Sequence, residues 1–350
     1  MLDGDVLIVK GAEIVSLLAG RERELIDKVR MAYEAHARGE SSLPHSTFLH
    51  LPDSPRNRII ALPAYLGGAS QAIGIKWVSS FPGNLTAGLD RASAILILNS
   101  PRTGRPKAVL EGSAISAKRT AASAALGAQR LFPDLQTPCL GIIGCGPINF
   151  EIVRYLIQLW PAIKDVVIYD LDVARAEQFK QKCRELLNGI ESQIKLDVKA
   201  VFNNSSLVSM ATTALQPYIF DLSECAPGSV ILNISLRDLA PQVILSCDNI
   251  VDDIDHLCRA QTSVHLAEQQ AGNRDFIRCT LADILQGMAP TRSETKKVAV
   301  FSPFGLGVLD IAVAQLVYEL AVKEGRGIVI DSFLPNSWSQ GAEGQSFSVA

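Results

Sequence analysis

The sequence has no surplus of positive charge and no long apolar run. Its 350 residues include 33 Lys and Arg against 36 Asp and Glu, a formal net charge of -3 that offers little to nucleic acid or an anionic membrane. No apolar run approaches the roughly 18 residues that a membrane span needs, and residues 1–10 lack the pattern of a signal peptide. We therefore expect a cytoplasmic protein that binds neither nucleic acid nor membrane and works on small molecules.

Sequence patterns for metal binding and for disulfides are absent too. The seven cysteines are odd in number and include no CxxC pair, so we expect reduced core thiols. The five histidines show no HExxH or similar spacing, so we predict ordinary polar histidines and no bound metal.

The chain has enough length and enough apolar residues for two hydrophobic cores. Hydrophobic residues make up 48% and charged residues 20% of the sequence, a balance typical of a globular protein. Domains usually hold about 100 to 200 residues, so a chain of this length predicts two domains.

Residues 1–131 mix helical and extended patterns in a way that predicts an α+β domain with an antiparallel sheet. A strand at 6–9 precedes a helical, charge-rich stretch from residue 13 to about 38. An alanine-rich helix is expected at 116–131. The short extended runs between them, separated by Pro- and Gly-rich turns, are residues 47–51, 58–62, 73–78 and 94–98.

From residue 139 onward, predicted strands and helices alternate. Helices are expected at 148–159 and 174–187. The predicted strands are residues 140–143, 166–169, 198–202, 207–211, 230–234 and 250–251. This alternation predicts an α/β fold, a Rossmann doubly wound parallel sheet with helices on both faces.

The end of the chain is expected to return to the first domain. A strand at 298–301 leads into a long apolar helix that ends near residue 323. Pro-rich breakers after residue 131 mark the other boundary. We therefore predict a split α+β substrate-binding and dimerisation domain (1–131 and 302–331), a dinucleotide-binding domain (132–301) and a mobile tail (332–350).

A glycine-rich turn after the predicted strand 140–143 has the pattern of a dinucleotide-binding fingerprint. Gly144 permits a tight turn and Gly146 lets the backbone approach a pyrophosphate. The helix that opens with Pro147 and Ile148 offers its free N–H groups to the phosphate charge. The third fingerprint position is Asn149 instead of Gly or Ala, so the match is imperfect.

Asp170 ends the second strand of this unit, roughly 20 residues beyond the turn, where a carboxylate accepts the ribose hydroxyls. The same charge repels a 2′-phosphate. The pattern therefore predicts NAD rather than NADP as cofactor, with a purely structural glycine turn as the alternative.

Two cations of the first domain are embedded among apolar residues. Lys76 lies in Ile73-Gly-Ile-Lys-Trp-Val, and Arg119 lies in the alanine-rich helix. Burial of either charge is costly unless an anion pairs with it, so each either binds an anionic ligand or is a structurally paired or snorkelling cation. Arg58 and Arg91, at the starts of predicted strands, are weaker candidates.

Together these segments resemble the ornithine cyclodeaminase/mu-crystallin family over about residues 5–325. The resemblance rests on the glycine turn and on five further segments. They are Arg58-Ile-Ile-Ala-Leu-Pro-Ala-Tyr, Lys76-Trp-Val, Arg91-Ala-Ser-Ala-Ile-Leu-Ile-Leu-Asn, Arg119-Thr-Ala-Ala and Gly305-Leu-Gly-Val-Leu-Asp310. It implies an NAD-dependent oxidoreductase with an amino-acid-derived substrate, and a homodimer formed through the first domain.

The resemblance also implies roles for the embedded cations. Lys76, Arg119 and Arg58 match the cations that hold the α-carboxylate and carbonyl side of an amino acid, with Lys76 and Arg119 turning the substrate Cα toward the nicotinamide. Arg91 and Arg237 are candidates for further carboxylates.

The resemblance assigns Asp238 the role of catalytic base. Ornithine cyclodeaminases carry this aspartate inside Gly-Gly-Asp-Cys-Pro-Gly-Lys-Thr-Glu-Leu, whereas here Asp238 is followed by Leu239-Ala-Pro-Gln-Val, which counts against ornithine deamination. Thr212 and Thr213 match positions on the nicotinamide side, with a capped loop as the alternative interpretation.

Within the family, Gln216-Pro-Tyr218 and Asn233-Ile-Ser235 are similar to members that supply L-2,3-diaminopropionate for siderophores or peptide antibiotics. This implies NAD-dependent oxidative hydrolysis of N-(2-amino-2-carboxyethyl)-L-glutamate to L-2,3-diaminopropionate, 2-oxoglutarate and NADH. The alternatives are an ornithine cyclodeaminase, an alanine dehydrogenase or ketimine reductase and, outside enzymes, a mu-crystallin-like binding protein.

Overall fold

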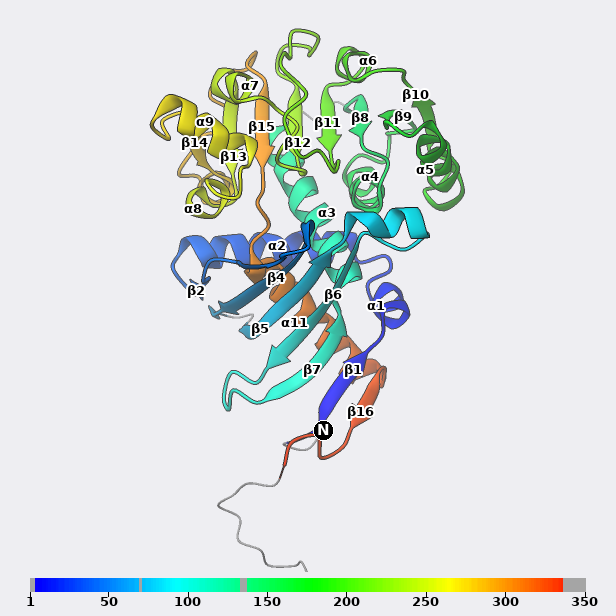
Figure 1. The fold of residues 1–350 in the computed structure, drawn as a ribbon, viewed down its shortest axis with the longest axis vertical. Coiled ribbons are helices and arrows are strands. Elements are labelled where there is room, and N and C mark those ends of the chain that lie inside the picture. The colour runs from blue at the N-terminus through cyan, green and yellow to red at the C-terminus, as the bar shows by residue number, and fades with distance from the viewer. Residues whose placement is uncertain (1–3, 69–70, 133–136, 336–350) are drawn as a thin grey trace, which may run out of the picture.

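The computed structural model describes residues 4–68, 71–132 and 137–335, which form two eight-stranded sheets (Figure 1). The first sheet comes from both ends of the described chain and the second from its middle. No described helix is long and apolar enough to cross a membrane. The predicted mobile tail falls almost entirely on residues 336–350, which lie outside the described residues.

The first sheet has the strand order β16-β1-β7-β6-β5-β4-β2, with β3 paired to β4. Its strands are β1 (Val6–Val9), β2 (Ser41–Ser42), β3 (Thr47–Leu51), β4 (Ser54–Leu66), β5 (Ala72–Ser80), β6 (Ala92–Asn99), β7 (Pro106–Glu111) and β16 (Ile328–Ile330). The prediction of an antiparallel sheet is correct for all its pairs except one, because β1 runs parallel to β7. The sequence analysis did not find β2, β7 or β16.

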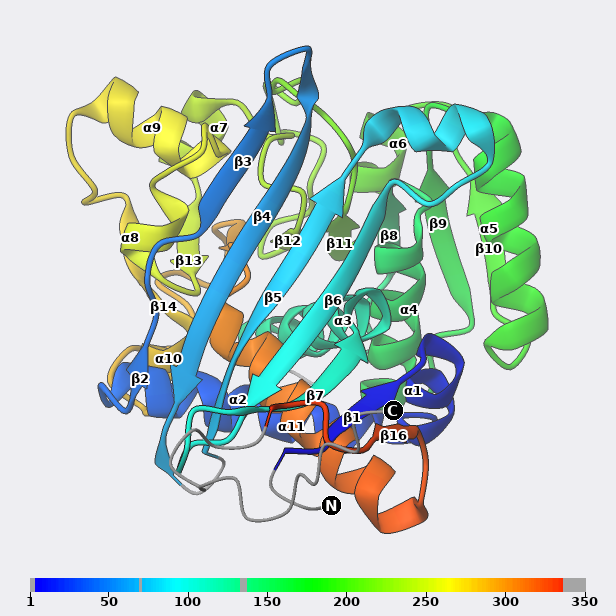
Figure 2. The same ribbon diagram turned by 60° about the horizontal axis from the view of Figure 1, so that its bottom comes forward.

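Helices cover one face of the first sheet and leave the other face open (Figure 2). They are α1 (Gly11–Leu17), α2 (Glu22–Ala37), α3 (Gly112–Leu131) and α11 (Gly307–Glu324), and a 3-10 helix spans Pro82–Ala87. The expected single helical stretch at 13–38 is two helices. Gly20, with φ of +73°, lies in the turn that separates them.

The second sheet has the order β10-β9-β8-β11-β12-β15-β13-β14, and all of its pairs are parallel. Its strands are β8 (Leu140–Ile143), β9 (Asp165–Tyr169), β10 (Glu191–Ile194), β11 (Leu207–Met210), β12 (Val230–Asn233), β13 (Asp248–Val251), β14 (Ile277–Thr280) and β15 (Ala299–Ser302). The first five strands have the Rossmann order, so the predicted doubly wound parallel sheet is confirmed.

Helices lie on both faces of this sheet. They are α4 (Pro147–Leu159), α5 (Val173–Leu186), α6 (Val198–Asn203), α7 (Pro241–Ser246), α8 (Ile254–Leu257), α9 (Ser263–Ala271) and α10 (Leu281–Leu285). The predicted strand at 198–202 was wrong, because this segment is α6. The Asp197 carboxylate accepts the Ala200 N–H and so starts a helix there, an N-cap signal that outweighs the β-branched valines.

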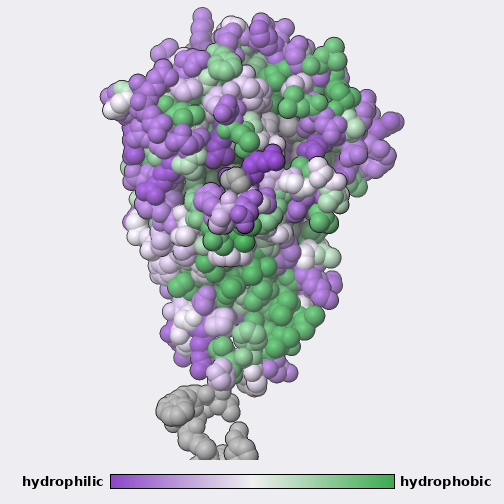
Figure 3. Space-filling view, viewed as in Figure 1, coloured by the Kyte–Doolittle hydropathy of each residue, from purple (hydrophilic) through white to green (hydrophobic). Residues whose placement is uncertain are grey.

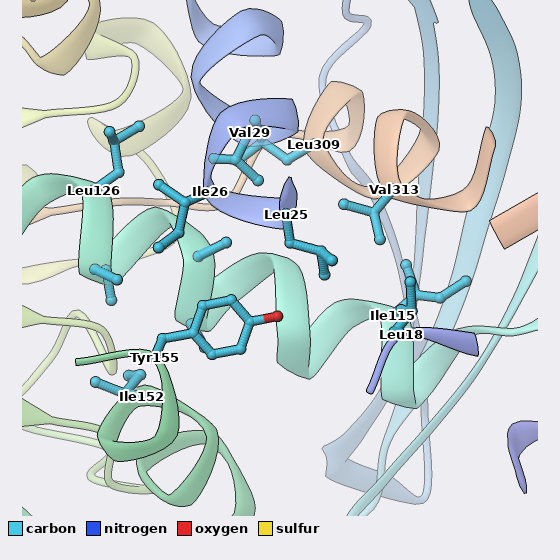
Figure 4. Packing of buried hydrophobic residues seen from close by; sticks show 14 of the residues in the cluster. Leu18, Leu25, Ile26, Val29, Ile115, Leu126, Ile152, Tyr155, Leu309 and Val313 are labelled. Atoms are coloured by element: carbon cyan, nitrogen blue, oxygen red, sulfur yellow. The ribbon is translucent and has the colours of Figure 1, made fainter. Parts of the chain in front are cut away.

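Helix α3 joins the two halves of the molecule. It packs on α2 and β6, and also on α4 and β12. At Gly127 an added Cβ would lie 2.5 Å from the Phe301 ring of β15, so only glycine permits this contact. Figure 4 shows side chains of α2, α4 and α11 converging on α3 in one continuous core. The carboxyl ends of β11 and β15 point toward the first sheet, which places any ligand between the two sheets (Figure 1).

Candidate active site

The turn between β8 and α4 leaves room for a phosphate. Gly144 has φ of +91°, and a Cβ there would lie 2.5 Å from the Ala211 carbonyl oxygen. At Gly146, in contrast, a Cβ would meet no atom within 4 Å. Gly146 is the N-cap of α4 and Pro147 occupies its first turn, so the free N–H groups of the helix begin at Ile148, beside the open space at Gly146, an arrangement that suits an anion.

Asp170 holds this turn from the end of β9. Its Oδ2 accepts the Cys145 N–H at 2.7 Å, and its Oδ1 accepts the Asp172 N–H at 2.9 Å. Each carboxylate oxygen keeps a second lone pair for a ribose hydroxyl. The structure thus brings the predicted fingerprint residues and Asp170 together at the carboxyl edge of the second sheet.

Asn149, at the imperfect third position of the fingerprint, is a buried structural link. Its Nδ2 donates to the carbonyl oxygens of Ile143 (3.0 Å) and Gly144 (2.7 Å), and its Oδ1 accepts the Ser209 hydroxyl at 2.7 Å. These bonds link the turn to β11. The Asn149 side chain thus holds helix and sheet together by hydrogen bonds, where a small residue at this position would do so by close packing. Sequence analysis missed this role because Asn149 departs from the consensus.

A cavity of about 210 Å³ lies between the two sheets and is lined by cationic side chains. Arg58 comes from β4, Lys76 from β5, Arg119 from α3 and Arg237 from the loop after β12. The fold therefore brings together four of the five predicted substrate-binding cations from distant parts of the chain.

Lys76 and Arg119 share one buried carboxylate, that of Asp310 in the first turn of α11. Lys76 Nζ lies 2.7 Å from Asp310 Oδ2, and Arg119 Nε lies 2.9 Å from Asp310 Oδ1. Burial lowers the pKa of Lys76 to about 8, helped by Arg119 and opposed by Asp310. Two cations with one carboxylate leave net positive charge at the cavity. The sequence analysis did not predict that Asp310 pairs with these cations. The signal for this pairing was an acidic residue inside an apolar helix.

A second group of cations has no carboxylate partner in the described part of the chain. Arg58, Arg91 and Arg237 form no ion pair within the described ranges, and the buried Nε of Arg58 has no hydrogen-bond partner there. Burial lowers the pKa of Arg91 and of Arg237, and the charge of Arg58 lowers both further. Arg91 donates to the Ser80 hydroxyl at 3.0 Å, and Ser80 pairs with Arg58 across β4 and β5, so Arg91 lies beside Arg58.

Two loops of the second half form the opposite wall of the cavity. Leu236, Ala260 and Gln261 have positive φ values of 68°, 54° and 55°, which are costly for residues other than glycine and cluster at functional sites. Arg237 joins these loops, because its Nη2 donates to the Ala260 carbonyl oxygen at 2.7 Å.

The segment between β15 and α11 is held against Arg119. Asp252, a buried residue at the end of β13, accepts the N–H groups of Phe304 (2.9 Å) and Gly305 (2.7 Å). Gly305 has φ of +93°, and a Cβ there would lie 2.6 Å from Arg119 Nη1. Burial raises the pKa of Asp252 to about 6, against the opposing effect of these two N–H groups.

Asp238, the predicted catalytic base, is fully buried behind the cavity wall. Its Oδ1 accepts the Thr212 hydroxyl at 2.5 Å, and its Oδ2 accepts the Ser235 hydroxyl. Thr212 thus lies beside Asp238 at the end of β11, while Thr213 is exposed. The roles proposed for Asp238, Thr212 and Thr213 stay predictions.

Fold and site together define a dinucleotide-binding α/β protein with a cavity lined by four cationic side chains. The profile of the ornithine cyclodeaminase/mu-crystallin family matches residues 7–325. The chain belongs to this family, as the resemblance predicted.

Known proteins similar to the chain cover almost its whole length. N-((2S)-2-amino-2-carboxyethyl)-L-glutamate dehydrogenase of Staphylococcus aureus is 27% identical over 344 residues, which cover 95% of this chain and 100% of that protein. An archaeal alanine dehydrogenase dimer with bound NAD superimposes with a TM-score of 0.82 at 25% identity, covering 93% of this chain and 99% of the other. Δ(1)-pyrroline-2-carboxylate reductase of Thermococcus litoralis, in complex with NADH and L-proline, superimposes with a TM-score of 0.82 at 25% identity. The match covers 92% of this chain and 99% of the other.

Proposed function

We propose that this protein is an NAD-dependent oxidoreductase that cleaves N-(2-amino-2-carboxyethyl)-L-glutamate to L-2,3-diaminopropionate and 2-oxoglutarate, with formation of NADH. The observation that carries the proposal is the excess of cations over carboxylates around the cavity. Lys76 and Arg119 share Asp310, and Arg58 and Arg237 form no ion pair among the described residues. A substrate with three carboxylates supplies the missing charges, whereas alanine and proline supply one each.

The glycine turn and Asp170 fit NAD. The open space at Gly146 takes the pyrophosphate, and the two Asp170 oxygens take the ribose hydroxyls. NAD supplies a hydride acceptor when it is bound. Tighter binding of NADP than of NAD, measured by calorimetry, would contradict the role given to Asp170.

On the substrate side, the proposed division of work follows the charges. Lys76 and Arg119 hold the α-carboxylate of the glutamate half and orient its Cα. Arg58 and Arg237 take the carboxylates farther from that carbon, with Arg91 behind Arg58. After hydride has left Cα, water adds to the substrate iminium carbon, and Asp238 takes the proton that this addition releases.

The proposal is tested by incubation of purified protein with NAD and synthetic N-(2-amino-2-carboxyethyl)-L-glutamate. We expect NADH, diaminopropionate and 2-oxoglutarate in equal amounts. Arg58→Ala should raise KM by roughly 10- to 100-fold, the loss of one charged hydrogen-bonding partner. Arg56→Ala is the matched control, because Arg56 is exposed on the same strand. NADH formation from L-alanine alone would indicate an alanine dehydrogenase. Formation of proline from ornithine without net NADH would indicate a cyclodeaminase.

The open face of the first sheet supports the proposed homodimer. Trp77 of β5 and Ile95 of β6 are paired across the strands and are 41% and 44% exposed. Figure 3 shows apolar surface over this part of the molecule. Contiguous apolar surface of this kind is typical of an interface. Trp77→Asp should shift the mass measured by light scattering from dimer to monomer.

The wider setting proposed for the reaction is precursor synthesis for a siderophore or a peptide antibiotic in the cytoplasm. The seven free cysteines suit a reducing compartment. The division into a split domain (1–131 and 302–331) and a domain of residues 132–301 remains a proposal as well, although the two sheets follow these ranges.

A further inference from the structure

The proposed base is out of reach of the cavity. Asp238 is 0% exposed, and its two carboxylate oxygens already accept the hydroxyls of Thr212 and Ser235. A water molecule in the cavity therefore has no direct contact with this carboxylate. A proton released in the cavity reaches Asp238 only through one of the groups that surround it.

Ser235 is the neighbour of Asp238 that lines the cavity. It lies directly after β12, in the loop that also carries Leu236 and Arg237. A serine hydroxyl has one proton to donate and two positions at which it accepts. The Ser235 proton goes to Asp238, with the Met210 carbonyl oxygen 3.1 Å away as a second acceptor, so the accepting side of the oxygen remains for the cavity.

Thr212 is a poorer candidate because it is not among the residues that line the cavity and its hydroxyl is already bonded within the protein as donor and as acceptor. Thr212 Oγ1 donates to Asp238 at 2.5 Å and accepts the Ala214 N–H at 3.1 Å. Tyr218 is the third hydroxyl beside Asp238. It is not among the residues that line the cavity, so it gives the carboxylate a hydrogen bond without offering a path from the cavity.

We propose that Ser235 relays protons between the cavity and Asp238, a role that rests on the proposed function. When water attacks, a C–O bond forms at the substrate iminium carbon and the C=N electron pair moves to nitrogen. The water proton passes to Ser235 Oγ as the Ser235 proton passes to Asp238 Oδ2. The products of this step are a neutral carbinolamine and a protonated Asp238.

The same path serves the cleavage that follows. Asp238 returns its proton to Ser235, and Ser235 protonates the amine nitrogen of the carbinolamine. The C–N bond then breaks with its electron pair on nitrogen, the carbinolamine O–H becomes the ketone of 2-oxoglutarate, and its proton goes to solvent. Both transfers use one hydroxyl, because water and amine occupy the same carbon.

The experiment compares Ser235→Ala, Ser235→Thr and Ser223→Ala with the wild type, using NAD and N-(2-amino-2-carboxyethyl)-L-glutamate. Ser223 is the matched control, because its hydroxyl also donates to a carboxylate, that of Asp221, but it is exposed and does not line the cavity. Stopped-flow absorbance follows the first NADH, and quenched samples follow diaminopropionate. For Ser235→Ala we expect the first hydride transfer within about threefold of wild type and product formation slowed roughly 100-fold, the scale of general acid–base catalysis. Ser235→Thr, which keeps the hydroxyl, should restore most of the rate.

Proton inventories in mixtures of H₂O and D₂O separate a relay from a structural effect. Two protons in flight predict a curved dependence of the wild-type product-forming rate on deuterium fraction, and a linear one for Ser235→Ala. Product formation by Ser235→Ala at the wild-type rate, or equal slowing of NADH formation and product formation, would overturn the relay while the proposed function stands. If the wild type forms no NADH from this compound, the proposed function falls, and the relay falls with it.

Discussion

The proposed cofactor side and the proposed substrate side of this site draw on the chain in different ways. The cofactor side uses residues of one βαβ unit, from Gly144 to Asp170. It offers a ligand mostly backbone N–H groups and open space. The substrate side uses charged side chains of β4, β5, α3, α11 and the loop after β12. Local backbone shape therefore governs the first side, and compensation of buried charge governs the second.

The largest expected effect of a single change is at Asp310. Asp310→Ala leaves Lys76 and Arg119 buried without their shared anion, so the free energy of unfolding should fall by about 3–5 kcal/mol. Chemical denaturation measures this. Glu319→Ala on the same helix is the control, because Glu319 is exposed and should change stability by less than about 0.5 kcal/mol. Equal effects of the two variants would refute the buried-charge interpretation.

Arg119→Ala should separate substrate turnover from cofactor binding. Loss of one of the two cations that we propose hold the substrate α-carboxylate is expected to lower kcat/KM by roughly 100- to 1000-fold, within the range for one partner of a buried charge pair. NAD affinity, measured by calorimetry, should remain within about threefold, because Arg119 lies on the substrate side. If Arg119→Ala bound substrate normally but no longer bound NAD, Arg119 would belong to the cofactor side instead.

Substitutions at two glycines test the proposed cofactor side. Gly146→Ala places a methyl group in open space, so stability should be unchanged while NAD affinity falls roughly 10-fold, since the methyl occupies the phosphate position. Gly144→Ala should lower the melting temperature instead, because the residue has φ of +91° and its Cβ would lie 2.5 Å from the Ala211 oxygen. Thermal melts and NAD titrations of both variants test this, and unchanged NAD affinity in Gly146→Ala would argue against a phosphate there.

The last expected effect is a pH dependence on the substrate side alone. Burial lowers the pKa of Lys76 to about 8, so the charged form that binds a carboxylate is lost as pH rises above that value. The inhibitor 2-oxoglutarate has no amine to titrate. Its inhibition constant should rise by about tenfold per pH unit above 8, because binding becomes weaker. Lys76→Arg should flatten this profile, because arginine stays charged. The same slope in both proteins would assign the titration to another group.

The same contrast explains which parts of the structure could be predicted from the sequence. Strands β8, β9, β11, β12 and β15 were predicted nearly to the residue, because buried parallel strands are short apolar runs between turns. The segment 198–202 was mispredicted because its apolar run looks like a strand, and only the Asp197 cap distinguishes it. The β1–β7 parallel pair joins segments about a hundred residues apart, which no local pattern reveals.

By itself, the sequence predicted the doubly wound sheet, the glycine turn and the carboxylate of Asp170 beside it, because these depend on spacing along one short stretch. It also singled out Lys76 and Arg119 as charges that need an anion. Only the tertiary structure decided that the anion inside the protein is Asp310, 234 residues from Lys76, and that Ser235 stands between Asp238 and the cavity. Such pairings depend on which elements pack together, and desolvation makes them decisive only once packing has excluded water.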